Sequence, residues 1–179
     1  FPSGVAYELP RSDYTCMASL RGSLAICVGL PNTTTYNTML GTPNPQTKFT
    51  VKFGEVSDGL SNTICFIEGA GKQKLYFVGK PTPGSSYTDG GYGLNSYYGD
   101  WNISRQVRGL SGASVLAPTA GGCSVINVWN EDNPYSFHTG GVQVCRGDGS
   151  VSFLSQNVAT STFYAMATRD GGETFANPE

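Results

Sequence analysis

The sequence contains few charged residues and a single histidine. Lysine, arginine, aspartate and glutamate together make up 13% of its 179 residues, and the formal net charge is -2. Basic residues form no block, so we expect no nucleic-acid partner, because phosphate binding needs clustered lysine and arginine. No apolar run reaches the length of about 18 residues that a membrane-spanning helix needs. The most apolar stretch, from Leu24 to Leu30, is far shorter.

Targeting segments are also missing from the sequence. The chain begins at Phe1 rather than at a methionine, and no signal peptide is visible. We therefore interpret the chain as a processed product or a fragment. On this interpretation, a leader or membrane-anchoring segment would precede Phe1.

The cysteines show none of the CxxC spacings of zinc sites and redox motifs. There are five of them: Cys16, Cys27, Cys65, Cys123 and Cys145. An odd number allows at most two disulfides, and we consider one between Cys16 and Cys27 and one between Cys123 and Cys145. Cys65 lies within a very apolar segment, so we expect it to be a buried free thiol.

The composition favours many short strands joined by turns, because glycine is abundant, at 24 residues, and aromatics reach 12%. Period-2 alternation over residues 49–53 predicts a half-buried strand. Residues 63–68 are apolar on both faces, as in a central strand. Residues 75–78 and 123–129 also have strand character.

The segment FHTGGVQVCRGDGSVSFL, residues 137–154, predicts a β-hairpin. Valines alternate with other residues on the first arm, and Asp148-Gly149 is a strong turn signal. The turn also accounts for Arg146-Gly147-Asp148, which otherwise matches an integrin-binding tripeptide.

A helix is predicted over residues 155–169. Ala159, Phe163, Met166 and Ala167 form one apolar stripe, and Gly171 and Gly172 would end the helix. Together these elements predict one α+β domain over residues 1–179, mainly an antiparallel sheet with long loops and a short C-terminal helix. We make no prediction for the fold of residues 14–46.

Enzymatic chemistry finds little support in the sequence. His138 and Cys145 would be more than about 20 Å apart on one extended segment, and Cys123 is the remaining candidate partner for the histidine. A structural role for His138, holding the start of a strand through backbone hydrogen bonds, is the simpler interpretation. We expect no enzyme and no cofactor, with Asn130, Glu131 and Asp132 as weak candidates for a calcium site.

Residues 84–101 form the best candidate for a binding loop. Tyrosine and tryptophan lie there among glycine, serine and asparagine, a composition typical of adaptable recognition loops. The alternative is that these aromatic side chains cover the core of the domain itself. The residues concerned are Tyr87, Tyr92, Tyr97, Tyr98 and Trp101.

Three motifs resemble a large bacterial family of prepilin-type, processing-associated proteins of unknown function. SDGLSNTICFIE (57–68) resembles its Asp-Gly-x-Ser-Asn-Thr segment, and SFHTGGVQVCRGDGSVSFL (136–154) contains its His-x9-Asp-Gly pattern. ATRDGGE (167–173) resembles its closing motif. The matching residues are Asp58, Gly59, Ser61, Asn62, Glu68, His138, Gly140, Gly141, Asp148, Gly149, Arg169 and Glu173.

This resemblance implies a pilin-like or pseudopilin-like globular head without its N-terminal helix. It implies a non-catalytic subunit of a filament or cell-envelope assembly, exported, with other protein subunits as partners and membrane contact only through the absent helix. The alternative is a secreted or surface binding module that uses residues 84–101 for a glycan or protein. We further expect Asp58 and Asn62 to close a turn, and Glu68 to pair with Arg169 in a network that His138 joins.

Overall fold

The structure is a computed structural model that describes residues 12–41, 51–72, 74–86, 105–111, 119–120 and 122–172. Its elements follow one another along the chain as β1 (Tyr14–Leu20), α1 (Gly22–Ala25), η1 (Ile26–Val28), η2 (Phe53–Glu55), β2 (Ile64–Glu68), β3 (Lys74–Phe77), β4 (Lys80–Ser86), β5 (Arg105–Val107), β6 (Leu110–Ser111), β7 (Thr119–Ala120), β8 (Gly141–Arg146), β9 (Val151–Ser155) and α2 (Thr160–Ala167).

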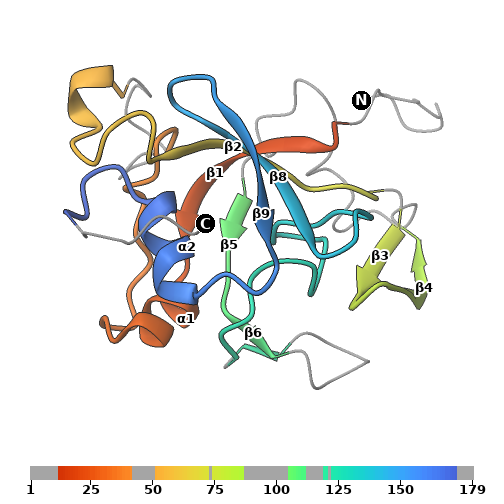
Figure 1. The fold of residues 1–179 in the computed structure, drawn as a ribbon. Coiled ribbons are helices and arrows are strands. Elements are labelled where there is room, and N and C mark those ends of the chain that lie inside the picture. Colours follow the sequence, from red (N-terminus) through yellow and green to blue (C-terminus); the bar gives the residue numbers. More distant parts are fainter. Residues whose placement is uncertain are drawn as a thin grey trace, which may run out of the picture.

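A five-stranded sheet in the order β5-β1-β2-β8-β9 forms the centre of the fold (Figure 1). Only the β1–β5 pair is parallel, and β1, β2, β8 and β9 pair antiparallel. The strands β3 and β4, and β6 and β7, make two small two-stranded sheets. This confirms the predicted α+β class with a mainly antiparallel sheet and a short C-terminal helix.

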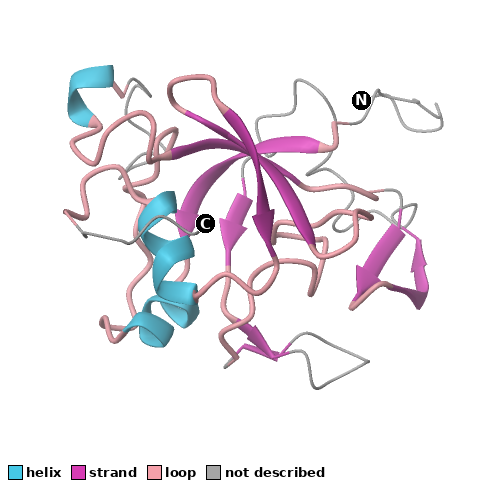
Figure 2. Cartoon of the chain, viewed as in Figure 1, coloured by secondary structure: helices cyan, strands magenta, loops and turns pink. Residues whose placement is uncertain are grey.

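One face of the sheet is covered by helices. Helix α2 packs beside α1 and η1 against β1 and β2, and Figure 2 shows both α-helices on the same side. The core there contains Ile67, Val142 and Phe163, each 0% exposed. The predicted apolar stripe is confirmed in part. Phe163, Met166 and Ala167 are buried, but Ala159 is exposed and precedes the helix, and Tyr164 and Ala165 are buried as well.

The opposite face, which we call the outer face, is partly open. Cys16, Phe66, Cys145 and Val151 lie opposite one another on β1, β2, β8 and β9, and cross-strand partners point to the same face. Phe66 is 44% exposed there and Val151 66% exposed. The central position predicted for residues 63–68 is therefore confirmed, but their strand is buried on one face only.

The β8–β9 hairpin forms where the sequence predicts it. Val142 lies opposite Leu154 and Val144 opposite Ser152. The Arg146 amide donates to the Ser150 carbonyl at 2.9 Å, which closes the turn. Gly149 adopts a φ of 86°, a left-handed conformation that favours glycine, so this half of the Asp-Gly turn signal is the physical reason for the turn.

Two predicted strands are wrong. Val51 and Lys52 are not in a strand and Phe53–Glu55 is a short 3-10 helix, because the Glu55 carboxylate accepts the Lys52 amide at 2.9 Å and closes a local turn. Residues 49 and 50 lie outside the described residues. Residues 123–129 make only isolated bridges and bends, because Asn127 adopts a φ of 60° and interrupts any extended run.

The C-terminal helix is shorter than predicted. It begins at Thr160 and ends at Ala167, and Thr168 is already extended. The Arg169 amide donates to the Asn37 carbonyl at 2.8 Å, so the chain leaves the helix before it reaches Gly171 and Gly172. In the part of the chain that the structure describes, no helix combines the length and apolar character needed to cross a bilayer.

The disulfide pairing differs from both pairings considered above. Cys27 is bonded to Cys123, with 5.6 Å between the Cα atoms, whereas Cys16, Cys65 and Cys145 are free thiols. Cys16 lies on β1 and Cys145 on β8, whereas Cys27 lies in η1. Cys65 is free as predicted, but half-buried rather than buried.

The environment of Cys65 keeps its thiol neutral. Burial, together with the neighbouring Cys145 and Cys16, raises the pKa of Cys65 to about 11. Because the thiolate is the reactive form of cysteine, this thiol is a poor nucleophile at neutral pH.

Candidate functional site: a polar scaffold of motif residues

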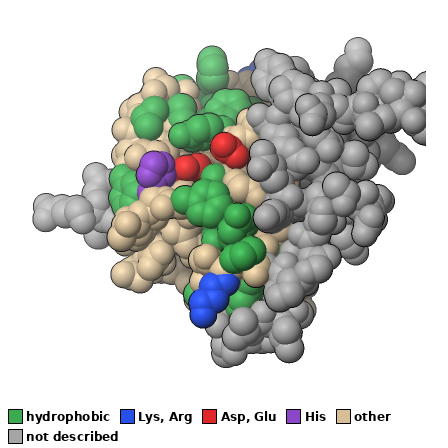
Figure 3. Space-filling model, turned by 90° about the vertical axis from the view of Figure 1, so that its right-hand side faces the viewer, with side chains coloured by type: hydrophobic (Ala, Val, Ile, Leu, Met, Phe, Trp, Pro, Cys, Tyr) green, Lys and Arg blue, Asp and Glu red, His purple; other side chains and the backbone are tan. Residues whose placement is uncertain are grey.

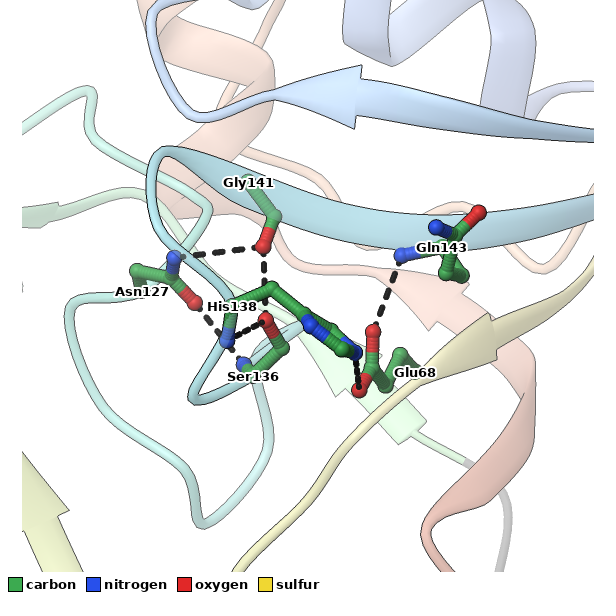
Figure 4. A network of polar contacts seen from close by, with 6 residues as sticks. All are labelled: Glu68, Asn127, Ser136, His138, Gly141 and Gln143. Atoms are coloured by element: carbon green, nitrogen blue, oxygen red, sulfur yellow. Dashed lines mark hydrogen bonds and ion pairs between the residues drawn. The ribbon is translucent and has the colours of Figure 1, made fainter.

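Glu68 occupies the point where β2 and β8 separate. Its side chain is buried, with one carboxylate oxygen accepting the Gln143 amide at 2.9 Å and the other 3.4 Å from Nε2 of His138 (Figure 4). The last backbone pair before this point is Ile67 with Val144. The carboxylate thus replaces a backbone carbonyl of β2 as the acceptor. It satisfies the Gln143 amide, which has no backbone partner on β2 at this position.

His138 is held over Glu68 by its own backbone. The Ser136 hydroxyl accepts the His138 amide at 2.9 Å and donates to the Gly141 carbonyl at 2.7 Å. The Asn127 side-chain oxygen in turn accepts the Ser136 amide at 2.8 Å. The histidine side chain remains 61% exposed. It therefore lies between the buried carboxylate and solvent.

The Gly-Gly pair after the histidine has a steric reason. Gly140 adopts a φ of 88°, which favours glycine. A Cβ atom on Gly141 would lie 2.1 Å from the Leu154 carbonyl oxygen, so no other residue fits without a backbone shift.

Aromatic side chains border the Glu68–His138 pair. Phe137 is 61% exposed and its ring lies 5.0 Å from that of Tyr76 and 5.8 Å from that of Tyr135, edge-on in both cases. Figure 3 shows this face, with the histidine beside an acidic side chain and hydrophobic side chains around them.

Asp58, in the turn before β2, connects the first motif to the C-terminal segment after α2. Its carboxylate oxygens accept the amides of Gly171 at 2.8 Å and Gly172 at 3.0 Å, and its own amide donates to the Arg169 carbonyl at 3.2 Å. The Asn62 side chain donates to the Asp58 carbonyl at 2.8 Å. The predicted turn between Asp58 and Asn62 is thus present, while the Asp58 carboxylate serves the C-terminal segment.

The predicted pairing of Glu68 with Arg169 is wrong. Arg169 donates from Nη1 to the carbonyls of Thr38 and Gly41, both at 3.0 Å. These carbonyls belong to a segment that follows β1, so the guanidinium satisfies backbone acceptors instead of a carboxylate. The prediction that His138 joins the network of Glu68 is confirmed.

The hairpin turn is tied to the first motif through its backbone. The Gly147 amide donates to the Thr63 carbonyl at 3.0 Å and the Asp148 amide to the Leu60 carbonyl at 3.2 Å. Hydrogen bonds from Ser150 lower the pKa of the Asp148 carboxyl group. The tripeptide from Arg146 to Asp148 is therefore part of the scaffold.

The remaining motif residues either lie in turns or fall outside the described residues. Gly59 adopts a φ of 93° in the turn before β2, and Ser61 is exposed. Glu173 lies outside the described residues. So do Tyr87, Tyr92, Tyr97, Tyr98 and Trp101, while residues 84–86 of the predicted binding loop form the end of β4.

The predicted calcium ligands do not converge on an ion. Asp132 pairs with Arg108 at 2.6 Å, and the carbonyls of Asn130 and Glu131 accept hydrogen bonds from the buried Lys72 ammonium. Two cationic side chains thus already bind the Asp132 carboxylate and the backbone carbonyls of Asn130 and Glu131. Among the residues that the structure describes, no three His, Cys, Asp or Glu side chains form a metal site.

The Cys123–His138 pairing considered for hydrolysis is also contradicted, because Cys123 is bonded to Cys27. Sequence reasoning missed Lys72, Asn127 and the role of Gln143. No local signal identifies Lys72, a single lysine after a glycine, as buried. Gln143 contributes only its backbone amide, so its residue type carries no signal for this role.

One known protein family matches most of the chain. The model of a family described as "Protein of unknown function (DUF1559)" matches residues 29–161. The chain belongs to this family. The match covers the first two motifs and the complete β8–β9 hairpin of this DUF1559 member. No curated protein and no solved structure matches the chain.

We expect Asp58→Ala to lower the free energy of unfolding by about 1–2 kcal/mol, because the amides of Gly171 and Gly172 lose a charged acceptor. Asp170→Ala, a change at an exposed aspartate in the same segment, should shift it by less than about 0.5 kcal/mol. Urea denaturation of both variants measures the difference. Equal effects of the two changes would contradict a specific role for Asp58.

Proposed function

We propose that this protein is a non-catalytic structural subunit of a pilin-like or pseudopilin-like assembly in the cell envelope. The observation that carries the proposal is where the motif side chains point. Asp58, Glu68 and Arg169 all bind groups of the protein itself, mostly backbone amides and carbonyls. Catalytic side chains would instead present reactive groups to a cleft.

The resemblance of the motifs to prepilin-type, processing-associated proteins supports the same proposal. In the described region, the His-x9-Asp-Gly pattern corresponds to one hairpin with its entry loop, from His138 to Gly149. Such a pattern specifies a folded unit rather than a reaction. Other subunits, identical or different, are the partners expected for a unit of this kind.

The disulfide supports an exported location. Structural disulfides persist in oxidising compartments and are rare in the cytosol. The Cys27–Cys123 bond joins segments 96 residues apart, so it stabilises the domain as a whole. We therefore propose the cell envelope or the extracellular space as the place of action.

The test is to isolate envelope and sheared surface fractions from the native source and to map the N-terminus of the protein by mass spectrometry. We expect a longer chain that begins with a methylated residue and an apolar helix, recovered with other subunits after crosslinking. A protein released as a monomer that starts at Phe1 would overturn the proposal.

A binding module is the second candidate, favoured by the exposed Phe137 beside His138. Aromatic rings at a rim of this kind are typical of glycan or peptide contacts. In a glycan-array or pull-down assay, Phe137→Ala would abolish capture without unfolding if the protein binds there. Unchanged capture would exclude this surface.

A further inference from the structure

Strand β9 forms one edge of the five-stranded sheet, and no other described strand pairs with its outer side. The last strand in the order β5-β1-β2-β8-β9, it contacts only β8 within the sheet. Its sequence, Val-Ser-Phe-Leu-Ser, contains no lysine and no proline, the residues that usually block open edges. The opposite edge, β5, is only three residues long.

The backbone groups that face away from β8 can be assigned. Hydrogen bonds from the Arg146 amide to Ser150 and from the Gln156 amide to Gly140 bracket the strand. Because hydrogen-bonded and non-bonded pairs alternate in antiparallel strands, Val151, Phe153 and Ser155 direct their amides and carbonyls outward.

These outward groups are almost all unused in the described part of the chain. Only the Ser155 carbonyl has a partner, the Val158 amide at 3.1 Å. Val151 is 66% and Phe153 47% exposed, so side chains leave the edge accessible. Helix α2 packs mainly on β1 and β2 rather than along the edge of the sheet at β9.

The edge is complementary to itself. If two copies pair antiparallel about Phe153, each copy donates its Phe153 amide to the Phe153 carbonyl of the other. Each also donates its Ser155 amide to the Val151 carbonyl of the other. The one occupied carbonyl, that of Ser155, is not required by these bonds.

Side chains agree with the same register. No residue of β9 is charged, so two copies do not repel one another along the strand. The two Phe153 rings would lie opposite each other on the outer face, an aromatic pair of the kind that stabilises antiparallel strands. The two outer faces would then continue into one another.

We propose that two copies of this chain associate through antiparallel pairing of their β9 strands, which joins their sheets into one. The inference does not depend on the proposed envelope function, because a binding module could dimerise through the same edge. A contact of one strand is small, so the association is weak and concentration-dependent.

Sedimentation equilibrium of the 179-residue chain, from micromolar to near-millimolar concentration, tests the proposal. We expect a reversible dimer that Phe153→Lys weakens by at least about tenfold, because two like charges then face each other. The matched control is Phe66→Lys, an equally exposed phenylalanine on the outer face but in the central strand, which should leave the dimer intact.

Hydrogen exchange of the unmodified protein gives a readout that needs no variant. With rising concentration, the amides of Phe153 and Ser155 should exchange more slowly, while that of Gln156, bonded to Gly140 already, should not change. A chain that stays monomeric throughout would overturn the proposal. So would equal weakening by both lysine variants, which would indicate contact through the outer face instead of the edge.

Discussion

Replacing Cys27 and Cys123 together by alanine is expected to lower the free energy of unfolding by about 4–5 kcal/mol. The bond joins residues 96 positions apart, and closing so long a loop removes much of the conformational entropy of the unfolded chain. The loss approaches the whole stability of a typical domain, so the variant should be largely unfolded near body temperature.

The contacts of the disulfide indicate which element is destabilised first. Cys27 lies in η1, which packs against α2, and the Cys123 carbonyl accepts the Thr160 hydroxyl at the start of α2 at 2.8 Å. Hydrogen exchange in α2 should therefore accelerate first. Thermal and urea denaturation of the double variant, with and without reductant, measures the effect.

Two controls separate the loss of the disulfide from the loss of a cysteine side chain alone. Cys145→Ala removes a free, half-buried thiol and should cost less than about 1 kcal/mol. Reductant should destabilise the unmodified protein and this control alike, and should have no further effect on the double variant. Equal stability of the oxidised and reduced protein would contradict the account.

Glu68→Ala is expected to lower the free energy of unfolding by about 2–6 kcal/mol. The change leaves the Gln143 amide without its acceptor and a void beneath His138, and each of these effects costs about 1–3 kcal/mol. Glu68→Gln should cost less, about 1 kcal/mol, because its side-chain oxygen can still accept the Gln143 amide.

The two partners of the Glu68–His138 pair should differ in how much they contribute to stability. His138→Ala should cost less than about 1 kcal/mol, because its side chain is largely exposed and contributes a surface contact. Glu55→Ala, at an exposed glutamate that closes only a local turn, is the matched control for the carboxylate. If Glu68→Ala costs no more than Glu55→Ala, Glu68 is not a structural carboxylate.

The sequence predicts those parts of the fold that local interactions determine. The β8–β9 hairpin follows from alternating valines and from the glycine required at position 149, and α2 from one apolar stripe. These signals depend on neighbours a few residues apart. Glu68 is the last residue of β2, and His138 lies in the loop that enters β8.

Partners distant in the sequence could not be predicted. Cys27 and Cys123 meet because η1 packs against α2 and Thr160 of α2 binds the Cys123 carbonyl, and no spacing rule expresses these contacts. Glu68 was expected to pair with Arg169 because opposite charges are the obvious partners. Backbone groups satisfy both side chains instead, and an unpaired amide such as that of Gln143 is invisible in a sequence.

We propose that the motif residues Asp58, Glu68 and Arg169 hold the fold together. The most direct test of this proposal is the free energy of unfolding of Asp58→Ala, Glu68→Ala and Arg169→Ala, measured by urea denaturation beside the unmodified protein. The account predicts that all three variants lose stability, with Glu68→Ala losing the most. Three variants as stable as the unmodified protein would contradict it and would indicate that these residues act on a ligand or substrate.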